Sequence, residues 1–369
     1  MKPIVLIACW IGIFVVGGWL RFESLGGRPV HADEATGAFI TARRMATAEY
    51  RFDPTHYHGP LLSSLAMPVF RMHGERGWAE FTKRTMRLGP AVAGTLLVLV
   101  PLWWRRRWGD GPMLLAAALL ATSPLLVYYS RMFIHEMHLA LFGLLALALV
   151  VPPPRRWGRA VAAGLAVGLM FADKETFVIS LLAWGGAGLL LVGEHRRVLS
   201  KEALCRAWRE FRIPVAGALL AALLISLAFY TDGFRAWGGA WDAVRTFFVY
   251  DTVEGHEKEF GYYLDLLVVP TKSGGHWWFE TPVAILALVV WVASYIPGTG
   301  SASWRATVRF VAYSAVGHLL IYSLIGYKTP WLMCLPWAHF CLLAGFGVTG
   351  FVRWHRGLQV AGAVAVVLA

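Results

Sequence analysis

The sequence predicts an all-α membrane protein, a polytopic bundle of about ten or eleven transmembrane helices. Apolar residues make up 57% of its 369 residues and charged residues only 15%, and the mean hydropathy is +0.56. Apolar stretches of nearly membrane-spanning length also recur along the whole chain. Because this composition excludes a water-soluble globule, we expect a single membrane domain over residues 1–369, with loops on its two faces.

The predicted spans are each near or somewhat below the ~20 residues that a helix needs to cross a bilayer. They are 3–20, 88–104, 112–129, 137–151, 158–173, 176–193, 213–230, 281–296, 310–326, 331–351 and 358–369. The first is interpreted as a retained anchor, because it is long for a signal peptide and Arg21-Phe22-Glu23 follows without a small-residue cleavage site. The last run is too short to cross comfortably, so we expect a chain that is truncated at its C-terminus or ends in a half-helix.

The positions of the basic residues predict how the protein is oriented in the membrane. The formal net charge is +12, but the basic residues lie in short runs beside apolar stretches instead of along one amphipathic face, which argues against a nucleic-acid partner. The runs fall on one side of the predicted bundle, at 105–107, 155–156, 196–212 and 353–356. The positive-inside rule makes that side cytoplasmic and predicts a multi-pass protein of the cell (inner) membrane. Three of the four cysteines lie inside apolar stretches and the fourth in a basic loop on the cytoplasmic side, so no disulfide framework is implied.

Two long loops are predicted on the extracytoplasmic face, 21–87 and 231–280. The first contains two segments that read as amphipathic helices lying on the membrane surface, Ala35 to Ala48 and His56 to Phe70. Three short turns on the same face carry one basic residue each, Arg131, Lys174 and Lys328.

The acidic pair Asp33-Glu34 opens the first of these surface helices. A carboxylate in the first turn of a helix is kept ionised by backbone N–H groups and the helix dipole. An ionised Asp33 is therefore a candidate general base for a hydroxyl or amine acceptor. The alternative is that Asp33 or Glu34 only caps the helix.

A second motif runs from Ser130 to His138 at an outer junction of two helices and contains Arg131 and Glu136. Both side chains are candidates to face a cavity. The alternative is a hydrated turn with an internal ion pair, which contributes little energy.

Two lysines at outer helix ends are candidate ligands for a lipid phosphate. Lys174 lies in Asp173-Lys174-Glu175, after an apolar run of only about thirteen residues, which places the triplet below the membrane surface. Lys328, in Tyr327-Lys328-Thr329-Pro330-Trp331, is the only charge in about forty residues. Either lysine is alternatively a snorkelling anchor at the interface.

Histidines gather on the predicted outer face, among them His135 and His138 one helical turn apart. A divalent metal is possible, although nothing resembles a tight ligand motif such as H-E-x-x-H. No cofactor is certain from the sequence.

These motifs together resemble the GT-C superfamily of membrane glycosyltransferases, in its protein mannosyltransferase and lipid A aminoarabinose transferase branch. Within it the chain is most similar to the bacterial and archaeal family associated with flippase activity in N-glycosylation. The landmarks occur in the expected order over nearly the whole chain: Asp33-Glu34, Phe52-Asp53-Pro54-Thr55-His56-Tyr57-His58-Gly59-Pro60-Leu61, Ser130-Arg131 with Glu136, Lys174-Glu175-Thr176 and Lys328-Thr329-Pro330-Trp331.

The resemblance implies a site. It makes Asp33 the base or acceptor-orienting acid, with Glu34 and Glu136 as further catalytic acids. It implies that basic residues at outer helix ends contact the lipid phosphate of the donor. The residues expected to bind the donor are Arg131, Lys174, Lys328, His56, Tyr57 and His58.

The sequence thus favours a membrane glycosyltransferase that moves a sugar from a polyprenyl-phosphate donor to a protein or lipid acceptor on the extracytoplasmic face. The mechanism implied is an inverting attack at the anomeric carbon. The alternative is a non-enzymatic carrier or flippase-associated protein, in which the same charges line a pathway for a lipid-linked head group. The acids gather at one face instead of lining mid-membrane segments, which favours the enzyme.

Overall fold

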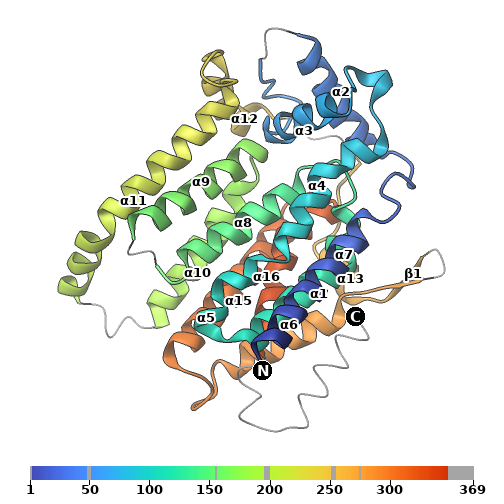
Figure 1. Cartoon of the computed structure of the whole chain (residues 1–369). Helices are drawn as coiled ribbons and strands as arrows, with labels where there is room; N and C mark the ends of the chain where they lie inside the picture. Colours follow the sequence, from blue (N-terminus) through green and yellow to red (C-terminus); the bar gives the residue numbers. More distant parts are fainter. Residues whose placement is uncertain are drawn as a thin grey trace.

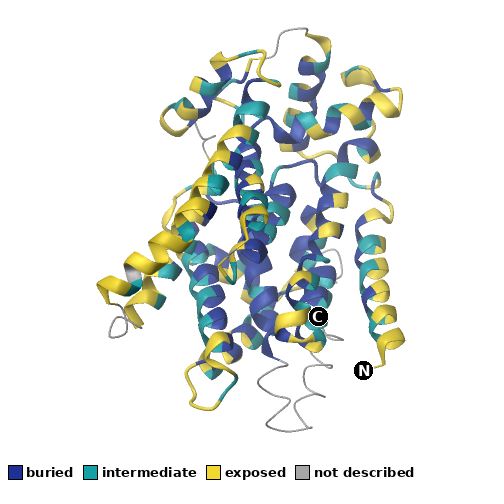
Figure 2. Cartoon of the chain, turned by 60° about the vertical axis from the view of Figure 1, so that its left-hand side comes forward, coloured by how far each residue is buried: buried dark blue, intermediate teal, exposed yellow. Residues whose placement is uncertain are grey.

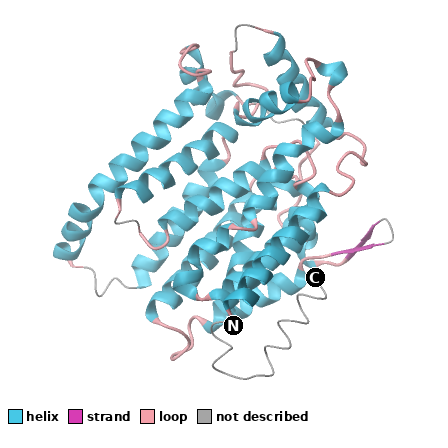
Figure 3. Ribbon diagram, in the orientation of Figure 1, coloured by secondary structure: helices cyan, strands magenta, loops and turns pink. Residues whose placement is uncertain are grey.

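The computed structural model describes residues 2–47, 51–153, 156–194, 200–250, 255–273 and 276–347. Helices dominate this part of the chain, and one short strand pair stands beside them (Figure 3). The helices of the bundle run roughly alongside one another (Figure 1). They are α1 (Pro3–Phe22), α4 (Lys83–Leu97), η2 (Val100–Trp104), α5 (Arg105–Trp108), α6 (Asp110–Thr122), α7 (Pro124–Tyr129), α8 (Glu136–Val150), α9 (Trp157–Asp173), α10 (Phe177–Glu194), α11 (Lys201–Tyr230), α14 (Thr281–Ala293), α15 (Ala302–Leu324), η4 (Pro330–Met333) and α16 (Cys334–Gly345).

The predicted fold class is confirmed: the chain is a helical multi-pass membrane protein. Helices occupy the described parts of the first ten predicted spans, and residues 348–351 and the run 358–369 lie outside the described residues. Within the described ranges, five helices are long and apolar enough to cross a membrane, Pro3–Phe22, Lys83–Trp108, Phe177–Glu194, Lys201–Tyr230 and Ala302–Leu324. Buried residues fill the middle of the bundle, and exposed ones lie on its outside (Figure 2).

A buried arginine joins three elements of the bundle where the helical ladder breaks between α6 and α7. The guanidinium of Arg21 donates hydrogen bonds to the carbonyls of Leu120 and Ala121, at 2.8 and 2.9 Å, and to the Ser130 hydroxyl at 3.1 Å. Pro124 begins α7 and cannot donate to the ladder. Arg21 therefore satisfies carbonyls that would otherwise be unpaired inside the membrane domain.

Helices α9 and α11 pack closely because small residues face each other. A Cβ atom at Gly168 would lie 2.5 Å from the carbonyl oxygen of Ala222, so only glycine fits there. The Ser226 hydroxyl also donates to the Gly168 carbonyl at 3.0 Å. Close approach of small residues with an added interhelical hydrogen bond is the usual way in which membrane helices associate.

The first long loop forms two helices and a short turn of 3₁₀ helix, α2 (Ala32–Ala46), α3 (Leu61–Met72) and η1 (Trp78–Glu80). The first begins three residues before its predicted start, because His31 and Glu34 form a reciprocal capping box. The second begins at Leu61 instead of His56, because Pro60 stands directly before it and Gly59 must pass close to another helix.

The second long loop contains α12 (Gly238–Val249), α13 (Tyr262–Val268) and an antiparallel pair of strands, β1 (Thr271–Ser273) and β2 (His276–Trp278). The strands were not predicted. Helices α2, α3 and α12 lie at one end of the bundle, whereas α5, which carries Arg105 to Arg107, lies toward the other end with the N-terminus (Figure 1). The structure therefore places the acidic motif and the basic run at opposite ends.

Candidate active site

The two acids of the first motif have different environments. Glu34 is buried, and its carboxylate accepts two hydrogen bonds from Arg87, at 2.7 and 2.8 Å, one from the backbone N–H of Phe133 at 2.9 Å and one from that of His31 at 3.0 Å. Burial would raise the pKa of Glu34, but these hydrogen bonds hold it below its ordinary value. Asp33, by contrast, has a side chain that is 48% exposed. Glu34 thus fixes the loop, and Asp33 is available to a substrate.

Glu136 and Lys174 form a buried ion pair, although 38 residues separate them in sequence. The Lys174 amine donates to Glu136 Oε1 at 2.6 Å, and the two side chains are 5% and 4% exposed. The neighbouring carboxylates Glu136 and Glu175 raise the pKa of Lys174 despite its burial. The amine is therefore a fixed positive charge, and it has two further N–H groups to offer.

His58 connects the first loop to the same cluster. Its Nδ1 lies 3.0 Å from Glu175 Oε2, and the phenol ring of Tyr250 stacks on its imidazole at 5.1 Å between centroids. The loop reaches this position through Gly59, where a Cβ atom would lie 2.2 Å from the Ala172 carbonyl oxygen. Burial opposes ionisation of Glu175, but His58 and Lys174 lower its pKa to about 2.

His135 lies beside His58 and contacts the end of α9. The two imidazoles meet edge to face at 5.2 Å, and His135 Nδ1 lies 3.2 Å from Asp173 Oδ1. Burial lowers the pKa of His135 to about 4 and that of His58 below its ordinary value. At neutral pH both are uncharged imidazoles that can pass or hold a proton.

A pH dependence of stability follows from these two histidines. The pKa of a histidine in the unfolded chain is about 6.5, so below this pH the unfolded chain binds protons that folded His135 and His58 do not bind. The contribution of these histidines to the free energy of unfolding is therefore fully present above pH 6.5 and is lost as the pH falls, for His135 toward about 4. We expect the thermal midpoint, followed by tryptophan fluorescence in detergent, to fall between pH 7 and pH 5. The variant His135→Gln should show a shallower fall, and an equally steep one would remove His135 from this account.

The turn after α15 also meets the acidic motif. The His31 and Trp331 rings lie edge to face at 5.5 Å. Burial raises the pKa of Tyr327, and the charges of Lys174, Asp33 and Glu136 are close enough to act on it as well. These contacts bring the acidic motif, Lys174 and the Tyr327 to Trp331 turn to one region of the described structure.

The other residues expected to bind the donor have different contacts. The Lys328 amine donates to the carbonyls of Lys258 and Ile325, at 2.9 and 2.5 Å. These bonds favour a structural role, in which Lys328 holds the second long loop against the end of α15. Arg131 donates to the carbonyls of Leu20, Glu23 and Ser24 at the end of α1. His56 is exposed and lies 3.4 Å from Asp53. A donor-binding role for Lys328, Arg131 and His56 stays a prediction.

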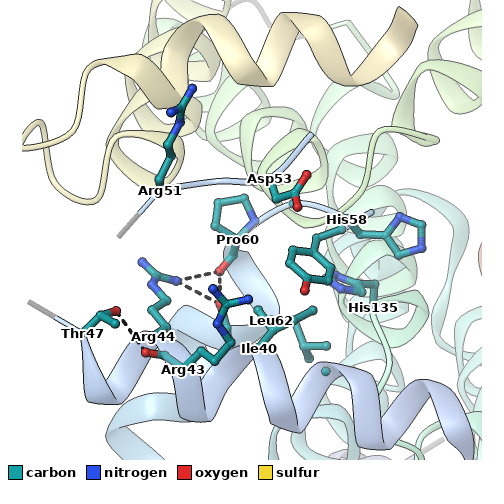
Figure 4. A pocket seen from close by; sticks show the side chains of 14 residues that line it. Ile40, Arg43, Arg44, Thr47, Arg51, Asp53, His58, Pro60, Leu62 and His135 are labelled. Atoms are coloured by element: carbon teal, nitrogen blue, oxygen red, sulfur yellow. Dashed lines mark hydrogen bonds between the residues drawn. The ribbon is translucent and has the colours of Figure 1, made fainter. Parts of the chain in front are cut away.

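A cavity of about 230 Å³ opens beside the cluster (Figure 4). Its walls come from α2, from residues 51–63 and from His135, and Tyr57 and His58 are part of its lining. His58 and His135 thus border both the cavity and the buried charges.

Sequence reasoning missed several members of this region. Tyr250 and Arg87 had no motif to mark them, and Glu175 was noted only as a neighbour of Lys174. Asp173 and His135 stood beside chosen residues, but only the fold shows that they contact each other. A buried carboxylate needs a cationic partner. Had one acid of Asp33-Glu34 been predicted as buried, a search for its partner could have pointed to Arg87.

The possible divalent metal finds no preformed site: among the described residues no three His, Cys, Asp or Glu side chains are arranged to hold a metal ion.

Comparisons with known proteins bear on the fold. No family model matches the chain, and no curated protein matches it in sequence. Among solved structures, ArnT from Cupriavidus metallidurans in the apo state superposes with a TM-score of 0.70, at 17% identity, covering 98% of this chain and 61% of ArnT. The apo oligosaccharyltransferase of Archaeoglobus fulgidus gives 0.59, at 14% identity, covering 98% of this chain and 52% of that enzyme. The Pmt1-Pmt2 protein O-mannosyltransferase complex of S. cerevisiae, bound to its sugar donor, gives 0.51, at 17% identity, covering 64% of this chain and 35% of that one.

All three are GT-C glycosyltransferases, so the resemblance predicted from the sequence is confirmed in the fold. The fold of the chain is similar to that of these three membrane enzymes. It spans about three fifths of the length of ArnT, which has also been solved with undecaprenyl phosphate bound.

Proposed function

We propose that the chain is a membrane glycosyltransferase that moves a sugar from a polyprenyl-phosphate donor to a protein or lipid acceptor. The observation that carries this proposal is that the exposed carboxylate of Asp33 and the buried, ion-paired amine of Lys174 both lie close enough to Tyr327 to act on it, in a chain with a GT-C-like fold. The ArnT complex with undecaprenyl phosphate and the mannosyltransferase complex with its sugar donor support the choice of donor.

In the proposed reaction Asp33 accepts the proton of the acceptor hydroxyl or amine, or orients that group. The acceptor atom then forms a bond to the anomeric carbon from the face opposite the phosphate, which gives inversion. The bond between the anomeric carbon and the phosphate oxygen breaks, and its electron pair leaves with the polyprenyl phosphate.

Lys174 stabilises the charge that develops on the leaving phosphate. A fixed ammonium in a water-poor site stabilises such charge more than it would in water, because the surroundings need no reorganisation. Glu136 holds the amine in place through their 2.6 Å hydrogen bond. The N-terminus of α8, at Glu136, adds a positive dipole end to the same place.

We propose an extracytoplasmic active face on a cell (inner) membrane protein. The supporting observation is that the acidic motif and the basic run 105–107 lie toward opposite ends of the bundle, and the positive-inside rule makes the basic end cytoplasmic. The rival carrier function would need charges along a path through the membrane. The described site charges instead gather at one end, at Asp33, Glu136, Lys174 and Glu175.

The proposal predicts a change in cell glycoconjugates. Membranes and envelope proteins from cells with and without the gene should differ in at least one sugar-bearing lipid or protein, measured by mass spectrometry. Restoring the gene should restore that species. Identical profiles with and without the chain would leave the carrier as the better account.

A further inference from the structure

The cavity beside the site has a strongly basic wall that no step of the proposed reaction uses. Three arginines line it, Arg43 and Arg44 from α2 and Arg51 from the following segment. Figure 4 shows Arg43 and Arg44 rising from α2, with Arg51 across the opening and turned towards α12.

Among the described residues, two aspartates near this wall are each shared by two arginines. Asp232 is shared by Arg44 at 2.9 Å and Arg235 at 2.5 Å. In the same way Asp242 is shared by Arg51 at 3.4 Å and Arg245 at 3.1 Å. Each aspartate thus serves two guanidinium groups, which leaves a surplus of positive charge.

Arg43 adds to this surplus. Among the residues that the structure describes it has no carboxylate partner, and its guanidinium lies 5.9 Å from the centre of the Phe39 ring. Asp53, a carboxylate that lines the cavity, is engaged by the Thr55 N–H at 2.9 Å and by His56. A planar guanidinium that is free to make paired hydrogen bonds is suited to a phosphate or carboxylate group.

The cavity is aligned with Asp33. Gly37, Ile40 and Arg44 line it from one face of α2, and Asp33 lies one turn before Gly37 on that face. The ten residues from Asp33 to Arg43 correspond to about 15 Å of helix. One substrate molecule of that length would reach both Asp33 and Arg43.

Arg43 and Arg51 are open to water, whereas Arg44 and Lys174 are buried. The side chain of Arg51 is 79% exposed, whereas that of Lys174 is 5% exposed. A lipid donor presents its phosphate at membrane depth, so a basic group on the water side faces the acceptor. The volume of about 230 Å³ is below the ~300–1,000 Å³ of drug-sized sites, so the cavity suits one head group.

We infer that this cavity is an acceptor subsite, in which Arg43, with Arg44 beside it on α2 and Arg51 across the opening, binds an anionic group of the phosphate or carboxylate class about 15 Å along α2 from Asp33. The inference rests on the proposed glycosyl transfer and specifies its acceptor as an anionic molecule. The test below needs no turnover, so it can fail separately from the proposed function.

Inorganic phosphate is the probe, titrated with the purified full chain in maltoside micelles, which carry no phosphorus. Broadening of the ³¹P signal reports binding. We expect saturable binding that Arg43→Gln weakens about tenfold. The control Arg71→Gln, at an exposed arginine on α3, should bind like the parent. A polyprenyl phosphate added to the parent should not displace the probe.

Three results would overturn the inference. The first is no saturable binding by the parent, and the second is equal binding by Arg43→Gln, which would place the anion elsewhere. The third is displacement by the polyprenyl phosphate, which would make the cavity the donor site. Thermal unfolding of each variant checks that a loss of binding is not a loss of fold.

Discussion

Sugar transfer by the Asp33→Asn variant is expected to fall by about 10²- to 10⁴-fold, the usual contribution of a general base. The exchange removes the charge and keeps the size and helix-favouring character of the side chain at the first turn of α2. Because Asp33 makes no buried ion pair and its side chain is 48% exposed, the thermal midpoint should stay close to that of the parent. The measurement is release of polyprenyl phosphate from the sugar donor in the presence of acceptor membranes.

The matched control is Asp110→Asn, which removes a partly exposed acid from the first turn of α6. This variant should keep the activity of the parent. Activity of Asp33→Asn within about threefold of the parent would remove Asp33 from the role of base.

The Lys174→Met variant is expected to lose both stability and donor use. It leaves Glu136 as a buried carboxylate without its cation, and breaking one side of such a pair costs about 3–5 kcal/mol in the free energy of unfolding. Transfer should fall about 10²- to 10³-fold, because the charge opposite the leaving phosphate is gone. Both quantities are measured on the purified chain in detergent, with unfolding followed by denaturant titration.

A double variant separates the two effects. Lys174→Met with Glu136→Gln removes both charges, so most of the lost stability should return while transfer stays low. Lys201→Met, at an exposed lysine that begins α11, should change neither quantity. If the stable double variant transfers sugar at the rate of the parent, Lys174 holds the fold together and does not act on the phosphate.

The sequence predicts the membrane spans well because hydropathy is a local property. Stretches such as 3–20 and 213–230 must be helical wherever they pack, since no other backbone satisfies its hydrogen bonds in lipid. The amphipathic segment after Asp33 is also predictable, because its periodicity and its acidic first turn are local features of the sequence. The strand pair β1 and β2 is too short to leave a periodic signal, and it was missed.

The site is less predictable because its contacts are distant in sequence. The motifs pick out Asp33, Glu136, Lys174 and His58, but they cannot show that Glu136 and Lys174 pair across 38 residues. They also rank Lys328 with Lys174, since each is an isolated lysine at a helix end. Only the fold shows that the Lys328 amine is turned to two backbone carbonyls.

Glu34 shows the same limit at shorter range. The sequence makes Asp33 the candidate base, but it leaves open that either acid only caps α2. The fold separates them, because Arg87 and two backbone N–H groups take up both oxygens of Glu34 and leave Asp33 open.

The central claim is that this chain transfers sugar from a polyprenyl phosphate through Asp33. Its most direct test is a single assay with a radiolabelled polyprenyl-phosphate sugar, purified parent or Asp33→Asn chain, and membranes from cells that lack the gene. The account predicts that label moves from the donor to an acceptor with the parent and stays on the donor with Asp33→Asn. Label that stays on the donor with both chains, or moves equally with both, would contradict it.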